Sequence, residues 1–335
     1  MTVPESMLAW QVPRLGEPLE VMTLAEVPVP QPGRGQALVE VWSTALNFPD
    51  VLMARGTYQE SPPLPFTPGI ELCGMVVAVG QGVERTRIGE RVIGTPALPH
   101  GALARYAVVD GADLYTAPPG LDDAAASAMH VAYQTAWFGL YRRAALRVGE
   151  TLLVNAAAGG VGSAAVQLGK AAGARVVGVV GSAAKADVVR TLGADLVVDR
   201  TRDDVVEAVR AVTKGRGADV VFDPVGGDAY TTAARAVAFE GRIVVVGFAG
   251  GTITQAPLNH VLLKNYSVVG LHWGLYRSKD PQLVRRAHDD LCNLVEAGAV
   301  RPLVSDRLPF EEASQGLARL AKGDTVGRVT VVPPT

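Results

Sequence analysis

The chain has 335 residues, of which 48% are hydrophobic, and its 31 basic and 33 acidic residues give a net charge of −2. This length permits two domains with a substantial core, and the near-neutral charge argues against nucleic acid as a partner. Two cysteines provide no disulfide framework, and neither the opening residues nor any apolar run resembles a signal peptide or a bilayer-spanning segment, so we expect a cytoplasmic protein without membrane contact.

The first 125 residues predict a mostly β unit. Apolar runs at 37–45, 75–79 and 103–109 have the length of strands, and turns rich in glycine and proline separate them. We therefore expect residues 1–125 to form the first part of one domain.

Residues 126–275 predict a different architecture, because strand-like runs alternate with helical patterns. Between 203 and 213, for example, Val205, Val206 and Val209 recur at the spacing of a helix that covers a sheet. Six strands connected in this way form a doubly wound parallel sheet, an α/β fold that binds ligands at the carboxyl ends of its strands. The expected strands lie near 151–155, 175–180, 195–199, 219–223, 242–247 and 267–271.

The last segment, 276–335, has patterns for helices at 281–297 and 310–322 and for a strand at 327–332. Periodicity does not show where this segment docks. One arrangement is a cofactor domain at 126–275 inserted into a domain that 276–335 completes.

A glycine-rich turn follows the first strand of the 126–275 unit. Gly160, Gly162 and Ala165 fit the G-x-G-x-x-[G/A] spacing, with a strand at 151–155 before them and an alanine-rich helix at 163–172 after them. Such turns also occur where two backbones merely cross closely. The strand and the helix on either side favour a dinucleotide-binding turn, with the pyrophosphate at the helix N-terminus.

The segment after the second strand indicates which dinucleotide binds. NAD-selective folds place an acidic residue about 20 residues after the glycine turn, but no carboxylate occurs between Glu150 and Asp187. Gly181, Ser182 and Lys185 stand there instead, and a Lys ammonium pairs with phosphate. This pattern predicts NADPH over NADH, and the alternative is that Lys185 is an ordinary solvated lysine on a helix face.

Four motifs carry a family resemblance: Leu-Asn-Phe-Pro-Asp-Val-Leu at 46–52, Gly-Thr-Tyr at 56–58, Pro-Phe-Thr-Pro-Gly-Ile-Glu at 65–71 and Ala-Ala-Ala-Gly-Gly-Val-Gly at 156–162. Together they resemble the zinc-free, zeta-crystallin-like quinone oxidoreductase branch of the medium-chain dehydrogenase/reductase superfamily. They also resemble the enoyl reductase domains of polyketide synthases. The resemblance implies a GroES-like, partly open β-barrel domain beside a Rossmann domain, and a homodimer joined through the Rossmann sheets.

The resemblance to the zinc alcohol dehydrogenases of this superfamily is broken at two ligand positions. Asn47 stands where those enzymes have a cysteine, and Ile70 stands where they have a histidine. Neither side chain replaces a thiolate or imidazole ligand of zinc, so we expect no metal. Conjugate reduction depends less on a Lewis acid, because hydrogen-bond donors stabilise the developing enolate. We therefore expect an NADPH-dependent reductase of quinones or activated alkenes.

The resemblance also assigns site residues. Asn47 and Tyr58 take catalytic positions, where the amide would donate to the substrate oxygen or orient the cofactor and the phenol would position the carbonyl. Their ordinary roles are a turn asparagine and a packed tyrosine. Arg200 would join Lys185 at the 2′-phosphate, unless it is a solvated turn residue. The remaining cofactor-binding positions are Phe48, Thr135, Gly159, Gly160, Val161, Gly162, Gly181, Ser182, Phe248, Leu271, His272 and Trp273.

Two other functions stay open. One is an enoyl-thioester reductase that acts on an acyl-CoA or carrier-bound chain, because the segment from Asn47 to Tyr58 is similar to polyketide enoyl reductases. The other is a non-catalytic NADPH-binding protein, because some relatives in the family have structural or nucleic-acid-binding roles.

Overall fold

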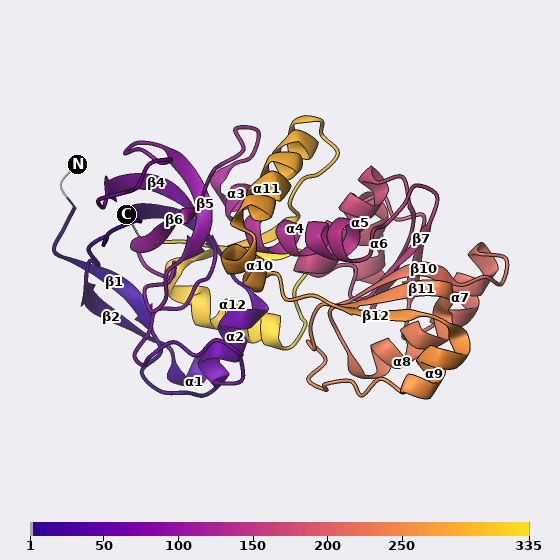
Figure 1. The fold of residues 1–335 in the computed structure, drawn as a ribbon. Coiled ribbons are helices and arrows are strands. Elements are labelled where there is room, and N and C mark those ends of the chain that lie inside the picture. The colour runs from indigo at the N-terminus through magenta and orange to yellow at the C-terminus, as the bar shows by residue number, and fades with distance from the viewer. Residues whose placement is uncertain (1–2, 335) are drawn as a thin grey trace. The chain divides into compact units, whose positions relative to one another are not determined.

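Two six-stranded sheets organise the chain, one in each of two units (Figure 1). The computed structural model describes residues 3–334. Unit 1 comprises residues 1–131 and 301–335, and unit 2 comprises residues 132–300.

The sheet of unit 2 is parallel throughout, with the strand order β12-β11-β10-β7-β8-β9. This order confirms the predicted doubly wound Rossmann sheet. Its strands are β7 (Thr151–Val154), β8 (Arg175–Val180), β9 (Leu196–Asp199), β10 (Ala218–Asp223), β11 (Val237–Val245) and β12 (Ser267–Gly270). The connecting helices are α5 (Gly160–Ala171), α6 (Ala183–Thr191), α7 (Val205–Val212), α8 (Gly227–Ala236) and α9 (Leu258–Lys264).

Alternate residues of each strand face opposite sides of this sheet. Leu153 and Val177 pack with Val205 and Val209 of α7 in one buried cluster. On the other side α5 lies so close that a Cβ added to Gly169 would meet Leu152 at 2.5 Å. The apolar runs are therefore continuous, as expected for strands that are covered on both faces.

Unit 1 is built around a partly closed barrel. Its sheet has the order β13-β14-β3-β4-β5-β6, and β6 pairs with β3 as well as with β5, which closes the last four strands. The strands are β3 (Gln36–Ala45), β4 (Leu72–Val79), β5 (Arg91–Pro96), β6 (Tyr106–Thr116), β13 (Val304–Pro309) and β14 (Arg328–Val332). This arrangement confirms the GroES-like, partly open barrel.

A two-stranded sheet and short helices complete unit 1. β1 and β2 form an antiparallel pair. The elements are β1 (Ser6–Gln11), β2 (Thr23–Pro28), α1 (Pro18–Val21), α2 (Phe48–Arg55), α3 (Asp123–Ser127), η2 (Phe310–Glu312) and α12 (Ala313–Ala321).

The unit boundaries differ from the expected 125/126 and 275/276. Residues 126–131 belong to unit 1, whereas 276–300 belong to unit 2 and not to the barrel domain as expected. Most of α10 (Gly274–Lys279) and all of α11 (Pro281–Glu296) lie in the segment 276–300. The helix α4 (His130–Trp137) and the π-helix η1 (Phe138–Arg143) lie where unit 2 begins.

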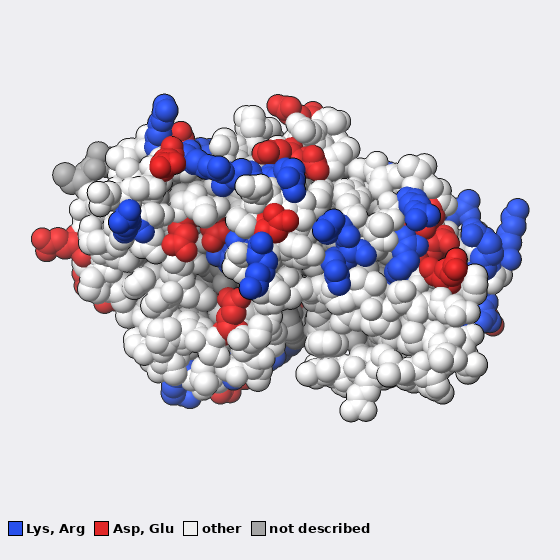
Figure 2. Space-filling model, viewed as in Figure 1, with Lys and Arg blue, Asp and Glu red and all other residues white. Residues whose placement is uncertain are grey.

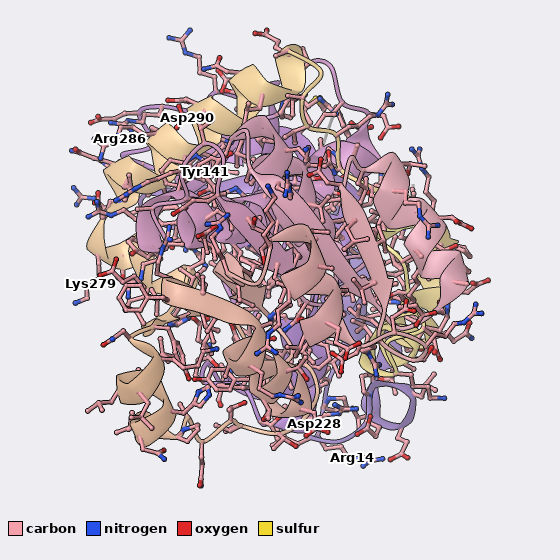
Figure 3. All side chains as sticks on the ribbon, turned by 90° about the vertical axis from the view of Figure 1, so that its right-hand side faces the viewer. Arg14, Tyr141, Asp228, Lys279, Arg286 and Asp290 are labelled. Atoms are coloured by element: carbon pink, nitrogen blue, oxygen red, sulfur yellow. The ribbon has the colours of Figure 1, made fainter. Side chains whose placement is uncertain are left out.

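Contacts with residues at the start of unit 2 explain why residues 276–300 belong to unit 2. Gln134 donates a hydrogen bond to the Val284 carbonyl at 3.0 Å, and the Phe138 and Tyr276 rings lie 4.3 Å apart. Tyr141 of η1 and Asp290 of α11 lie in the same region of Figure 3, and burial together with the charge of Asp290 raises the pKa of Tyr141 to about 12. The amphipathic pattern of 281–297 predicted the helix but not the surface that it covers.

Candidate active site

The glycine turn of unit 2 has the geometry of a phosphate-binding loop. Gly159 caps the N-terminus of α5 with extended backbone, and Ala156 adopts a φ of 48°. A Cβ at Gly162 would lie 2.1 Å from the Ala156 carbonyl oxygen, so no other residue fits without moving this turn. Gly159, Gly160 and Val161 are half-buried, which leaves the start of α5 accessible to an anion.

The predicted 2′-phosphate residues lie at the ends of β8 and β9. Ser182 caps α6, where its hydroxyl accepts a hydrogen bond from the Lys185 amide. The Arg200 guanidinium lies over Gly181, 3.3 Å from where a Cβ would stand, and donates no hydrogen bond to a residue within 3–334. The fold thus brings Arg200 to the same strand ends as Ser182.

Asp199, the carboxylate next to Arg200, is hydrogen-bonded within its own turn. Asp199 accepts hydrogen bonds from the amide and the hydroxyl of Thr201, at 3.0 and 2.7 Å. These bonds hold the pKa of Asp199 below its usual range. The residues present therefore fit NADPH: an open helix start for the pyrophosphate, and cationic side chains where an NAD-selective fold has an acid.

The remaining predicted cofactor residues of unit 2 lie in its core or follow its strands. Thr135 lies in α4 and is 9% exposed, and Leu271 and Trp273 are also buried, at 9% and 8%. Phe248 is 36% exposed and packs over Gly226, whereas His272 is exposed. In unit 1, Phe48 is the half-buried first residue of α2.

Asn47, the first predicted catalytic residue, is a member of a buried polar cluster in unit 1. Its amide nitrogen donates to the Ala45 carbonyl at 2.9 Å and to Glu71 Oε2 at 3.0 Å, and its Oδ1 accepts from Arg328 Nη1 at 2.9 Å. The side chain is 3% exposed. Both amide hydrogens are used inside the protein, so none remains for a substrate oxygen in this arrangement.

Two carboxylates complete the cluster. Asp50 accepts from the Asn47 and Gly69 amides, both at 2.9 Å, and burial raises its pKa to about 6. Glu71 accepts from the Val131 amide at 2.7 Å and pairs with Arg328. Burial raises the pKa of Glu71, and the positive charge of Arg328 opposes this shift.

Arg328 is the residue that sequence reasoning missed. It begins β14, is 281 positions from Asn47 in the chain and is 6% exposed. The sequence contains a signal for this residue, because Arg328 is the one charged residue of a strand that otherwise holds valines and a threonine, Arg-Val-Thr-Val-Val. Such a residue is rarely buried unless it is paired.

The cluster does not fit a zinc ion. Ile70 provides no donor atom, the Asn47 amide is fully hydrogen-bonded, and Glu71 is neutralised by the Arg328 guanidinium. Among residues 3–334, no group of three His, Cys, Asp or Glu side chains has the arrangement of a metal site. The contacts within the cluster are hydrogen bonds and the buried ion pair of Glu71 with Arg328.

Tyr58, the second predicted catalytic residue, lies in the turn after α2. Gly56 ends this helix with a φ of 70°, which directs the chain toward Tyr58. The tyrosine is half-buried and packs against the core cluster that contains Trp10 and Phe310. The Asn47 cluster and Tyr58 thus lie at opposite ends of the same eight-residue helix, Phe48–Arg55.

Comparison with known proteins places this geometry in a family. Residues 33–119 match the alcohol dehydrogenase GroES-like domain, and residues 160–289 match the zinc-binding dehydrogenase family. The quinone oxidoreductase-like protein 2 of Bos taurus is 37% identical over 316 residues, which are 94% of this chain and 89% of that protein.

A solved structure and a much longer enzyme are also similar. The Escherichia coli quinone oxidoreductase complexed with NADPH is 28% identical, with a TM-score of 0.89 over 97% of this chain and all of that one. The phthioceranic/hydroxyphthioceranic acid synthase of Mycobacterium tuberculosis is 31% identical over 95% of this chain but only 15% of the synthase. The chain is an oxidoreductase that belongs to the quinone oxidoreductase branch of the medium-chain dehydrogenase/reductase superfamily.

Proposed function

We propose that this protein is an NADPH-dependent reductase of quinones or α,β-unsaturated carbonyl compounds and that it acts without zinc. The observation that carries the proposal is the Asn47–Glu71–Arg328 cluster, which fills the zinc-ligand region with an internally paired cation. The NADPH bound to the similar Escherichia coli enzyme supports the cofactor.

In unit 2, we assign the residues that would hold NADPH from their positions at the glycine turn and at the ends of β8 and β9. The amides at Gly160 to Gly162 would bind the pyrophosphate, and Ser182, Lys185 and Arg200 would bind the 2′-phosphate. Thr135, Phe248, Leu271 and Trp273 would flank the nicotinamide. When bound, NADPH supplies the hydride that reduces the electron-poor carbon of the substrate.

In unit 1 we assign different roles to the two catalytic candidates. Asn47 is a positioning residue, because its amide is tied to Glu71 and Arg328 and fixes the start of α2. Tyr58 donates its phenolic hydrogen to the substrate carbonyl, where negative charge develops as the hydride arrives.

Replacing Tyr58 by Phe is expected to lower kcat/KM for a quinone by roughly tenfold to a hundredfold, because a hydrogen bond to developing charge is worth about 1.5–3 kcal/mol. NADPH affinity should not change. Steady-state kinetics and a fluorescence titration with NADPH measure the two quantities. Tyr106→Phe, a buried tyrosine of β6, is the control. An equal loss in both variants would remove Tyr58 from the mechanism.

The substrate class is tested with a panel that contains a benzoquinone, an ortho-quinone, an enone and crotonyl-CoA, each mixed with protein and NADPH. We expect loss of NADPH absorbance with the quinones or the enone. Faster turnover of crotonyl-CoA would favour the second candidate, an enoyl-thioester reductase, which the similarity to the mycobacterial synthase supports. Tight NADPH binding with no turnover would indicate a non-catalytic protein.

We also propose that two copies associate through the edge of the unit 2 sheet. β12 is the outermost strand, and the surface beside it exposes large apolar side chains. In Figure 2 the region of α8, α9 and β12 is largely uncharged on the face shown. The exposed residues are Phe239 at 69%, Leu258 at 77%, Leu262 at 71%, Leu263 at 76% and Val268 at 40%. We name them the apolar edge.

Changing Leu262 and Val268 to Glu is expected to convert a dimer to a monomer. Each buried aliphatic side chain contributes about 1.5–3 kcal/mol to association, and a charge on both partners would add repulsion. Light scattering coupled to gel filtration measures the mass. Val148→Glu is the control, because Val148 is an exposed valine, 82% accessible, outside the apolar edge. A wild-type monomer would overturn this proposal.

Within residues 3–334, no helix combines the length and the apolar character that a membrane span requires. We propose small-molecule substrates, which the similarity to quinone oxidoreductases supports, and a second copy of the chain as the macromolecular partner.

A further inference from the structure

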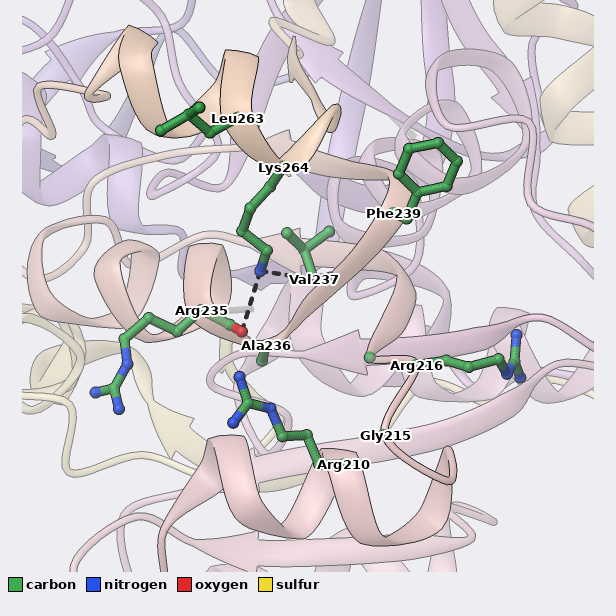
Figure 4. A pocket seen from close by; sticks show the side chains of 10 residues that line it. Arg210, Gly215, Arg216, Arg235, Ala236, Val237, Phe239, Leu263 and Lys264 are labelled. Carbon is green, nitrogen blue, oxygen red and sulfur yellow. Dashed lines mark hydrogen bonds between the residues drawn. The ribbon is translucent and has the colours of Figure 1, made fainter.

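Unit 2 has a cavity of about 280 Å³ at the end of the sheet where the strands begin. It is bounded by the turn before β10, the start of β11 and the end of α9. Figure 4 shows Arg210 reaching toward Ala236 and Lys264, with Arg216 and Arg235 to either side. We call this space, lined by Arg210, Arg216, Arg235 and Lys264, the basic cavity.

The basic cavity is separate from the proposed NADPH site. The glycine turn and Arg200 follow the carboxyl ends of β7 and β9, whereas the basic cavity lies before the amino ends of β10 and β11. β10 has six residues, and at about 3.3 Å per residue the two edges are roughly 20 Å apart. The cofactor therefore does not explain these cations.

Two of the cations are exposed at the surface and have no close partner among residues 3–334. Arg210 and Arg235 form no ion pair with, and donate no side-chain hydrogen bond to, any residue within 3–334. Arg216 has Asp219 at 3.8 Å, a long ion pair on the surface. Lys264 is held in place, because its ammonium donates to the carbonyls of Ala234, Arg235 and Val237 at 2.8, 3.2 and 3.1 Å.

The residues that line the basic cavity include four cations and no carboxylate. Burial and, to a smaller extent, the charge of Arg210 lower the pKa of Lys264. The Asp204 carboxylate is held by the amides of Val206 and Glu207 at the other end of α7, although Arg210 and Arg235 act on its pKa. An anion would relieve the repulsion between the cations.

A simpler explanation is that these residues cap helix ends. Arg210, Arg235 and Lys264 each lie in the last turn of a helix, where a cation offsets the partial negative charge of the dipole. Lys264 donates to the last carbonyls of α8 and not to those of its own helix, α9. Arg210 and Arg235 are exposed and donate no side-chain hydrogen bond to a residue within 3–334. The dipole therefore accounts for the positions of these cations, and the exposed guanidiniums of Arg210 and Arg235 remain available to an external anion.

We propose that the basic cavity binds a phosphate or pyrophosphate group, held by the guanidiniums of Arg210 and Arg235. Guanidinium provides paired donors that match phosphate oxygens. The volume is near the lower limit of small-molecule sites, about 300 Å³, so the occupant is a phosphate group and not a whole dinucleotide. The group is either a free anion or the phosphate of an ester.

Isothermal titration of the full chain with pyrophosphate, in saturating NADPH so that the cofactor site is filled, tests the proposal. A second titration with AMP distinguishes a phosphate ester from a free anion. We expect Arg210→Gln with Arg235→Gln to weaken binding by roughly tenfold or more, and Arg210→Lys with Arg235→Lys to restore part of it. Arg190→Gln, an exposed arginine of α6, is the control.

Three results would overturn the proposal: no binding of either probe, equal binding by wild type and the double Gln variant, or the same heat from chloride at equal ionic strength. Thermal unfolding of each variant establishes that it is folded. Should the protein fail to bind NADPH, the proposed function would fail alone, because the comparison of wild type with the double Gln variant still reports on the basic cavity.

Discussion

Replacing Arg328 by Ala is expected to lower the free energy of unfolding by about 3–5 kcal/mol, because the change leaves the Glu71 carboxylate buried without its cation. The side chains of Arg328 and Glu71 are 6% and 0% exposed, so bulk solvent does not screen this pair. Asn47 would also lose the hydrogen bond to its Oδ1. Urea unfolding of wild type and variant measures the difference.

The loss should depend on pH. Burial already raises the pKa of Glu71, and removing Arg328 removes the charge that opposes this shift. In the variant the folded state therefore favours the protonated carboxyl more than the unfolded state does. Stability is retained at low pH, where Glu71 is neutral in both states, and is lost as the pH rises through the folded pKa.

Two further variants separate the buried pair from arginine loss in general. Arg307→Ala removes an exposed ion pair with Asp122, whose side chains are 57% and 48% accessible, and should cost no more than about 1 kcal/mol. Arg328→Leu combined with Glu71→Gln removes both charges and should be more stable than Arg328→Ala. If Arg328→Ala were as stable as Arg307→Ala, the cluster would not have the structural role that we assign to it.

The second large effect concerns the choice of cofactor. Lys185→Glu combined with Arg200→Glu is expected to lower kcat/KM with NADPH about a hundredfold, because charge-assisted bonds to phosphate are worth about 1.5–3 kcal/mol each and solvent reduces this at an accessible site. The value with NADH should change little, since NADH has no 2′-phosphate. The ratio of the two kcat/KM values is the measured quantity.

Arg190→Glu is the matched control for charge reversal, because Arg190 lies on α6 with Lys185 but pairs with Asp187 on the surface. Its cofactor preference should equal that of wild type. An unchanged preference in Lys185→Glu with Arg200→Glu would show that another part of the chain recognises the phosphate, and an equal loss with NADH would indicate damage to the fold.

Much of the fold could be predicted because local pattern and environment agree. The inner Rossmann strands are covered on both faces, so β7, β8 and β10 appear as largely apolar runs with bounds close to those expected, and the outer strands β9 and β12 appear as short valine-containing runs. β11 begins at Val237, five residues before the predicted start, because Glu240 and Gly241 interrupt the apolar pattern and Glu240 adopts a φ of 56°. Hydrophobic periodicity therefore could not predict the part of β11 that precedes this irregularity.

The parts that could not be predicted depend on contacts between distant residues. Glycine spacing located the turn before α5, since its backbone geometry is local. The pairing of Arg328 with Asn47 and Glu71 depends on β14 joining β3 in one sheet, which no local pattern specifies. The basic cavity likewise combines residues of α7, α8 and α9, which are far apart in the sequence.

The most direct test of the central claim is the rate of benzoquinone reduction by protein dialysed against a strong zinc chelator, measured with NADPH and with NADH. We expect that activity survives dialysis, does not rise when zinc is added, and is greater with NADPH. Activity that disappears with the chelator and returns with zinc, or a preference for NADH, would contradict it.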